Sequence, residues 1–122
     1  MVKVEGWSAE LEKGESGKPL MRIKITAKVD GVLRKYAITY GRYDGNTAKA
    51  FAYASAKAPG GREADAKRFA AVIKALTGRE PKVYQRSDGT IEIECGREHL
   101  DGFWRYKEFA DAIEEWLEQT EG

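Results

Sequence analysis

Apolar and polar residues alternate along the first half of the chain, which predicts β-strands. From Leu20 to Val29 one set of alternate positions is apolar, and the other set is mostly basic or hydroxylated. A period of two is typical of a strand with one buried face. Asp30-Gly31 follows directly and is a strong signal for a two-residue hairpin turn. The pattern therefore predicts an antiparallel hairpin of residues 20–29 and 32–41.

A two-residue turn determines which residues of this hairpin lie opposite one another. Counting outward from the turn, one face carries the pairs Val29/Val32, Ile25/Tyr36, Ile23/Ile38 and Met21/Tyr40. The other face carries Lys28/Leu33, Thr26/Lys35, Lys24/Ala37 and Arg22/Thr39, with no acidic residue among them. A turn one residue longer would mix the two sets, because side chains alternate between the faces of a sheet. We therefore expect one apolar face and one basic face.

Two more strands are predicted beside this hairpin. Residues 2–11 alternate with a shift in phase at Gly6, which indicates a β-bulge. Residues 47–58 alternate alanine with larger side chains. Alanine favours a helix, but strict alternation favours a strand, and we expect a strand that returns beside residues 32–41.

The face occupied by Phe51 and Tyr53 depends on the length of the loop at Asp44-Gly45. A loop of two or four residues puts Phe51 opposite Ile38 and Tyr53 opposite Tyr36, inside the core. An odd number of residues puts both rings on the basic face, where they would form a stacking platform for unpaired bases. Because large aromatic side chains are normally buried, we expect the core position, with the alanines on the basic face.

Helical periodicity begins after Pro59-Gly60-Gly61. Apolar residues recur at helical spacing up to Gly78, which predicts a helix containing Ala66, Phe69, Ala70, Ile73 and Leu76. Glu63 and Asp65 suit the positive N-terminal end of this helix.

A short hairpin and a second helix complete the chain. Residues 82–86 and 90–95 form the hairpin, and a three-residue loop puts Val83 opposite Ile93 and Lys82 opposite Glu94. The last helix is predicted from about residue 103 to residue 119, with Asp101 as its N-cap. Its apolar stripe consists of Phe103, Tyr106, Phe109, Ala110, Ile113 and Leu117, with Trp116 at the border.

The predicted order of elements is β-β-β-β-α-β-β-α, in a single domain of residues 1–122. Strands joined by short turns form antiparallel sheets, and amphipathic helices can cover one face of such a sheet. We therefore predict an α+β fold: an antiparallel β-sheet with two amphipathic helices packed on one face.

Composition narrows the class of protein further. No apolar run approaches the ~20 residues of a membrane span, and the N-terminus lacks the apolar stretch of a signal peptide, so we expect a cytoplasmic protein without a membrane partner. Cys95 and His99 are the only residues of their types, which excludes an internal disulfide and a multi-Cys or multi-His zinc site within one chain. Scarce Asn, Gln and Met with abundant Glu, Lys and Arg are typical of hyperthermophile proteins.

No catalytic centre, metal or cofactor is expected. Cys95 and His99 lie four residues apart, but nothing nearby orients a base or supplies an oxyanion site. Cys95 is expected as a buried strand residue and His99 near the approach to a helix. Gly60-Gly61 lacks the spacing of a phosphate-binding loop and indicates only a tight turn.

Charge is unevenly distributed along the chain. Residues 1–58 carry eleven basic and six acidic residues, whereas residues 59–122 carry ten basic and fourteen acidic residues. Phosphate contacts dominate the affinity of proteins for nucleic acid, and a sheet can present basic side chains to it. The sequence therefore predicts a non-catalytic DNA-binding domain, with the basic face formed by Arg22, Lys24, Thr26, Lys28, Lys35, Thr39, Lys49 and Lys57.

Other partners are alternatives to DNA. RNA would satisfy the same basic side chains, and a homodimer would be needed if the fold is half of a symmetric saddle over a duplex. The second functional hypothesis is a protein-protein interaction module that uses the acidic C-terminal helix, through Trp116 and Glu114, Glu115 and Glu118.

Residues 58–66, 74–78, 88–91, 95–103 and 110–117 carry a resemblance to a known family. Over most of residues 1–119, and most specifically from Pro59 onward, the chain resembles the C-terminal region of the PaREP-type paralogous proteins of hyperthermophilic crenarchaea. It implies an archaeal, thermophilic source, but it implies no biochemical activity.

The helix-hairpin-helix unit from Arg62 to Leu117 also resembles half of a LAGLIDADG homing endonuclease. That family lays an antiparallel sheet along the major groove of DNA, which agrees with the basic face. Its catalytic acid ends a glycine-containing N-terminal helix, whereas this chain begins with strands, so the resemblance implies DNA binding without a transferable catalytic residue.

Overall fold

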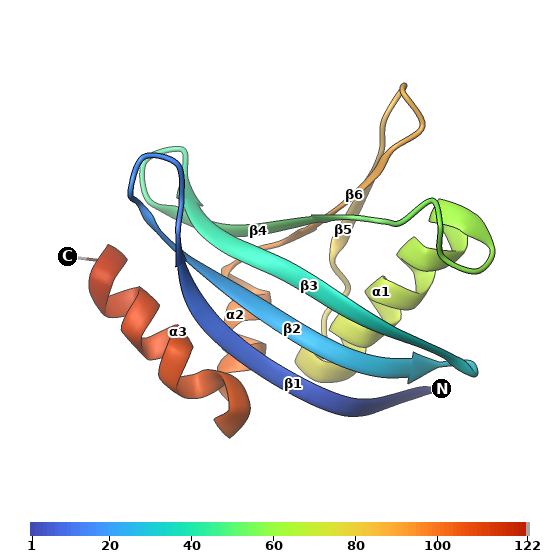
Figure 1. Cartoon of the computed structure of the whole chain (residues 1–122). Coiled ribbons are helices and arrows are strands. Elements are labelled where there is room, and N and C mark those ends of the chain that lie inside the picture. The colour runs from blue at the N-terminus through green and yellow to red at the C-terminus, as the bar shows by residue number, and fades with distance from the viewer. Residues whose placement is uncertain (122) are drawn as a thin grey trace.

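Four strands from the first half of the chain form a continuous meander, and a hairpin from the second half extends it. The structure, a computed structural model, describes residues 1–121. The six strands form one antiparallel sheet in the order β1-β2-β3-β4-β6-β5, with three helices on one face (Figure 1). The strands are β1 (Val2–Lys13), β2 (Pro19–Val29), β3 (Val32–Tyr43), β4 (Thr47–Tyr53), β5 (Lys82–Gln85) and β6 (Ile91–Cys95); the helices are α1 (Gly61–Thr77), α2 (Arg97–Trp104) and α3 (Lys107–Thr120). The predicted α+β class is confirmed.

The central hairpin has the register predicted from its turn. Asp30 and Gly31 both have positive φ, 48° and 87°, as the favoured two-residue hairpin turn requires. Ile25 lies opposite Tyr36, and Lys24 lies opposite Ala37, so that apolar and basic residues are separated as expected. The register of β1 against β2 shifts between Val4 and Gly6, which confirms the predicted bulge.

The register of β4 differs from the prediction. Tyr43 pairs with Thr47, so the loop contains three residues, and Phe51 lies opposite Thr39 instead of Ile38. Phe51 and Tyr53 are therefore on the polar face of the sheet, and the alanines Ala48 and Ala50 are buried on the other face. Asp44 and Gly45 have φ of 49° and 90°, and these left-handed conformations close the three-residue loop.

Small residues suit the buried side of β4 because the core beneath it is already filled. Ala50 pairs with Tyr40, and the Tyr40 ring lies 6.0 Å from that of Trp116. Both aromatic side chains are fully buried. A large side chain from β4 would therefore compete with them for the same space.

The C-terminal region contains two helices where one was predicted. Asp101 does not cap a helix; it lies within α2 and pairs with Arg97 at 3.0 Å. The chain breaks between α2 and α3, and the Tyr106 hydroxyl donates a hydrogen bond to the Leu76 carbonyl. Residues six apart on one continuous helix point about 120° apart. The break instead lets Phe103 and Phe109 both enter the core, with ring centroids 5.7 Å apart.

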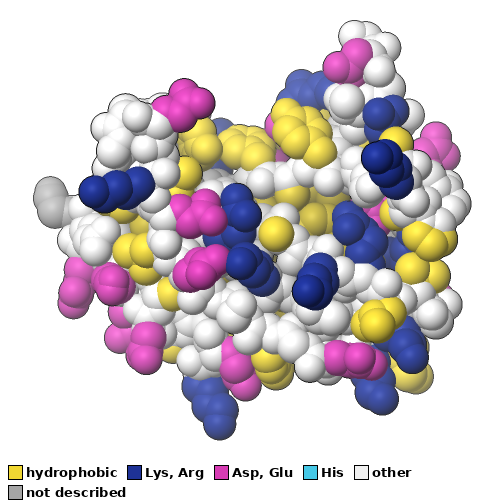
Figure 2. Space-filling model, viewed as in Figure 1, with side chains coloured by type: hydrophobic (Ala, Val, Ile, Leu, Met, Phe, Trp, Pro, Cys, Tyr) yellow, Lys and Arg dark blue, Asp and Glu magenta, His cyan; other side chains and the backbone are white. Residues whose placement is uncertain are grey.

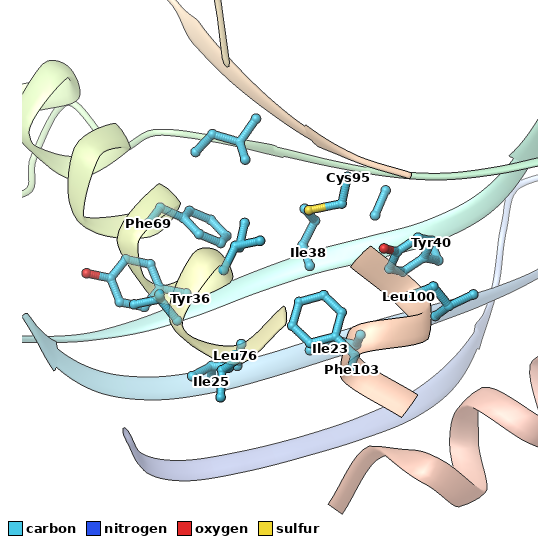
Figure 3. Close-up of a cluster of buried hydrophobic side chains, with 14 of the residues drawn as sticks. Ile23, Ile25, Tyr36, Ile38, Tyr40, Phe69, Leu76, Cys95, Leu100 and Phe103 are labelled. Carbon is cyan, nitrogen blue, oxygen red and sulfur yellow. The ribbon is translucent and has the colours of Figure 1, made fainter. Parts of the chain in front are cut away.

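The core lies between the helices and the covered face of the sheet (Figure 3). Strand residues such as Ile23 and Ile38 meet Phe69 and Leu76 of α1 and Leu100 of α2. Cys95 is buried among them as predicted, and its burial raises the pKa of the thiol. The helix α1 ends at Thr77, and Gly78 is its C-cap, which agrees with the predicted stop at Gly78. None of the helices in residues 1–121 is both long and apolar enough to cross a membrane.

Candidate nucleic-acid interface

The face of the sheet opposite the three helices is solvent-exposed, and we call it the open face (Figure 1). It carries seven of the eight residues predicted as a nucleic-acid site: Arg22, Lys24, Thr26, Lys28, Lys35, Thr39 and Lys49. Lys57 does not belong to it, because β4 ends at Tyr53 and Lys57 lies in the connection to α1. The predicted strand was too long at this end, and Ser55 instead accepts a hydrogen bond from the Lys57 amide.

The open face is less purely basic than the central hairpin alone suggested. Glu10 of β1 lies 2.7 Å from the Lys24 ammonium, and Glu12 lies 3.2 Å from Arg22. The interaction with Lys24 lowers the pKa of Glu10. The predicted strand ended at residue 11, and the sequence alone did not place Glu10 or Glu12 beside the basic residues, because their contact with β2 follows from the strand register.

Acidic residues also occur on β6. Glu92 is buried between Tyr53 of β4 and Tyr84 of β5, and it pairs with Arg86. Glu94 lies opposite Lys82, as the sequence predicted. The open face therefore has a basic part on β1–β3 and a part on β4–β6 where carboxylates and cations alternate.

Three lysines gather at one end of the basic part. Lys3 of β1 lies directly opposite Lys28 of β2, and Lys35 lies opposite Thr26, the neighbouring position on this face. None of the three forms an ion pair with any residue in the described part of the chain. Figure 2 shows basic side chains across the centre of the open face, with acidic ones close to some of them.

A shallow hollow lies on the basic part of the open face. It has a volume of about 440 Å³, and Lys24 and Lys35 stand at its rim. Small residues surround it: Gly6, Ser8, Thr26 and Ala37. Trp7, Ile25 and Tyr36 also line the hollow, but their side chains pack against the core on the other face. The bulge at Gly6 and the small side chains on this face allow a ligand to approach the strands closely, with two ammonium groups and the hydroxyls of Ser8 and Thr26 within reach.

Aromatic side chains line the neighbouring part of the open face. This aromatic row consists of Tyr43, Phe51, Tyr53 and Tyr84. The ring of Tyr43 meets that of Phe51 edge-on at 5.2 Å, and the Arg86 guanidinium lies 5.4 Å from the Tyr84 ring. The sequence placed Phe51 and Tyr53 on this face only if the loop before β4 had an odd number of residues, and that loop has three.

Cys95 and His99 do not form a catalytic pair. The His99 Nδ1 accepts a hydrogen bond from the Gly96 amide at 3.0 Å, and Nε2 lies 2.9 Å from the Glu80 carbonyl oxygen. Both ring nitrogens are therefore engaged in holding the start of α2 and the end of the segment before β5. The buried Cys95 thiol, whose pKa is raised, is a poor nucleophile. No cluster of potential metal ligands occurs within residues 1–121.

The acidic last helix, α3, presents fewer side chains to a protein partner than the sequence predicted. Trp116 is fully buried and donates a hydrogen bond to the Pro19 carbonyl, so it is not available to a protein partner. Glu114 accepts a hydrogen bond from the Trp104 indole. Of the three acids predicted for this surface, only Glu115 and Glu118 remain exposed without a partner among the described residues.

A buried ion pair was missed by sequence reasoning. Asp65 of α1 is fully buried, with Arg34 donating two hydrogen bonds to it and the Ser55 amide a third. Of the two acids predicted at the N-terminal end of this helix, Glu63 lies in its first turn, whereas Asp65 lies beyond that turn and is buried in the ion pair. Arg34 occupies an apolar phase of β3, opposite Ala27, and Asp65 precedes Phe69 by one helical turn. A polar residue on each of two apolar stripes was the sequence signal for this buried pair. The pair attaches α1 to the sheet.

Comparison of the chain with protein-family models, curated proteins and solved structures finds no match. The resemblances to the PaREP-type proteins and to the LAGLIDADG endonucleases therefore stay predictions.

Proposed function

We propose that this protein is a non-catalytic nucleic-acid-binding domain, with DNA as the first expected partner, and that the open face is its binding surface. The observation that carries the proposal is an uncovered sheet face on which Lys24 and Lys35 stand beside a hollow, with the small residues Gly6, Ser8, Thr26 and Ala37 around it. Phosphate groups need closely placed cations and hydroxyl donors, and this hollow supplies both.

Ion pairs on the open face do not prevent such binding. Lys24 and Glu10 are about half exposed, and exposed pairs of this kind contribute little to stability. A phosphate can replace the Glu10 carboxylate at Lys24 without removing a structural contact. Within residues 1–121, Lys28 and Lys35 have no carboxylate partner to release.

The proposal is tested with the double variant Lys24→Glu/Lys35→Glu in a titration with labelled DNA. The matched control is Lys67→Glu/Lys74→Glu, which makes the same change in charge on exposed positions of α1, on the other side of the sheet. We expect the affinity to fall at least about tenfold in the open-face variant and less than about twofold in the control.

Salt dependence gives a second readout of the same contact. If three lysines each contact a phosphate, a fourfold rise in salt concentration lowers the affinity about 20- to 40-fold. The open-face variant should show a weaker dependence. Equal affinity of a folded open-face variant and the natural chain would overturn the proposal.

A further inference from the structure

The most exposed aromatic side chains of the described residues all lie on the open face. Tyr53 is 61% exposed, Tyr43 is 40% exposed and Tyr84 is 37% exposed. Phe51 joins them because the three-residue loop before β4 turns it to this side. Figure 2 shows hydrophobic side chains together in the hollowed region between the loops at one end of the sheet and the β5–β6 hairpin at the other.

Exposed aromatic rings can contact bases only where the bases are unpaired. In a duplex each base is covered on both faces by its neighbours, so a protein ring finds no free base face. In a single strand the bases can separate and stack on aromatic side chains. A duplex would use only the lysines of the open face and would leave the aromatic row without a partner.

Neighbouring rings on β4 have a spacing that suits an extended strand. Phe51 and Tyr53 are two residues apart on one face, which separates them by about 7 Å. This is about twice the ~3.4 Å rise per nucleotide of a duplex strand, so it corresponds to bases pulled apart from one another. Successive bases can therefore each meet one ring.

The charges of the open face indicate how such a strand would lie. One row of cross-strand neighbours runs from Arg22 through Thr39 and Phe51 to Glu94, with Glu10 next to Arg22 on β1 and Lys82 next to Glu94 on β5. It is cationic on β2, aromatic on β4 and acidic on β6. A sugar-phosphate backbone is attracted to the first part and repelled by the last, and the bases beside it then reach the aromatic row.

We propose that the open face binds single-stranded nucleic acid, with its phosphates over the lysines of β2 and β3 and its bases stacked on Phe51 and Tyr53; this inference rests on the proposed function. The shared chemistry of single-stranded DNA and RNA fits equally, since the rings contact base faces and the lysines contact phosphates. The experiment distinguishes DNA from RNA by using one single-stranded probe of each kind.

The experiment measures fluorescence anisotropy of three labelled probes: oligodeoxythymidine and oligouridine of about 12 nucleotides, and a DNA duplex of the same length. The decisive variant is Tyr53→Ala. Two controls accompany it: Tyr53→Phe keeps the ring, and Leu33→Ala removes a similarly exposed apolar side chain of the open face that cannot stack on a base.

We expect the natural chain to bind at least one single-stranded probe about tenfold or more tightly than the duplex. Tyr53→Ala should lose about 5- to 100-fold in affinity for that probe and remain unchanged toward the duplex. Tyr53→Phe and Leu33→Ala should both keep the affinity of the natural chain. Tighter binding of oligouridine indicates RNA as the ligand, and tighter binding of oligodeoxythymidine indicates DNA.

Two results would overturn the inference, and they are distinguishable. Lysine-dependent binding that is as tight for the duplex, with no effect of Tyr53→Ala, removes the single-strand assignment and leaves the proposed function standing. Absence of binding to all three probes at low salt removes both.

Discussion

The two faces of the sheet are built from the same strands, yet they are constrained in different ways. On the covered face, Ile23 and Ile38 are fully buried against the helices, and a change in their size or register disturbs the core. On the open face, their direct neighbours Lys24 and Ala37 are exposed and contact no helix. Stability therefore constrains one face closely and leaves the composition of the other free for binding.

The two faces also differ in where charge is found. The covered face carries the Arg34–Asp65 pair, whose partners are held by several hydrogen bonds and serve to join α1 to β3. The open face carries pairs such as Lys24–Glu10 that are exposed and exchangeable. A charge on the covered face is thus part of the fold, whereas a charge on the open face is available to a ligand.

The largest difference between the faces should appear in a pair of adjacent alanine substitutions. Ile23→Ala removes a fully buried side chain and should lower the free energy of unfolding by about 2–5 kcal/mol. Lys24→Ala, the next residue on the open face, should change it by less than about 0.5 kcal/mol. Denaturation by urea measures both, and equal losses would show that the two faces are not constrained differently.

The observed register of β4 can be tested by enlarging a residue on its buried side. Ala50→Leu should lower the free energy of unfolding by about 1–3 kcal/mol, because Ala50 is fully buried beside Tyr40 and Cys95. Lys49→Leu, one residue earlier, is the control on the open face and should have little effect on thermal unfolding. If Ala50→Leu is neutral, the alanines point to solvent and the register is wrong.

Alkaline pH should lower the free energy of unfolding, because the Cys95 thiol and the Tyr40 hydroxyl are buried in the core and stay protonated there. Burial raises the pKa of Cys95 and of Tyr40 in the folded protein, so their ionisation is easier in the unfolded chain. Their contribution to stability is complete below the unfolded pKa, about 8.5 for cysteine, and is lost as pH rises.

Each such group lowers the free energy of unfolding by about 1.4 kcal/mol per pH unit above its unfolded value. Urea titrations between about pH 8 and 10 measure this slope, and Cys95→Ala should remove the part that belongs to cysteine. A slope that Cys95→Ala does not change would contradict the assignment.

The smallest expected effect on stability, and an opposite one on binding, comes from Glu10→Gln. This change removes the exposed carboxylate that competes with phosphate for Lys24. The melting temperature should stay the same, and the affinity for nucleic acid should rise a few-fold because the surface becomes more positive. A fall in affinity would show that Glu10 belongs to the binding surface itself.

The parts of the fold that were predictable depend on local signals. Asp30-Gly31 defines a turn of one length, and the pairs on both sides of it follow by counting. The pairing of Val83 with Ile93 was predictable for the same reason, because Ser87-Asp88-Gly89 closes a three-residue loop. A helix with a clear apolar stripe and a terminal glycine, such as α1, was also predictable.

The parts that were not predictable depend on packing between distant segments. Asp44-Gly45-Asn46 is compatible with loops of several lengths, and the space taken by Tyr40 and Trp116 decides among them. The break between α2 and α3 results from the need to bury Phe103 and Phe109 together.

The candidate site was predictable only in part for a related reason. Six of its eight residues follow from alternation in the central hairpin. The position of Lys49, the neutralising acids on β1 and the position of the aromatic row follow from pairing between strands.

Chemical footprinting of lysines tests most directly whether the open face is where nucleic acid binds. Acetylation of each lysine is measured by mass spectrometry with and without a saturating oligonucleotide, single-stranded and duplex. The expected result is strong protection of Lys24 and Lys35 by at least one of the two, with Lys67 and Lys74 of α1 unchanged. Protection confined to the helix side, or equal on both sides of the sheet, would contradict the assignment of the open face.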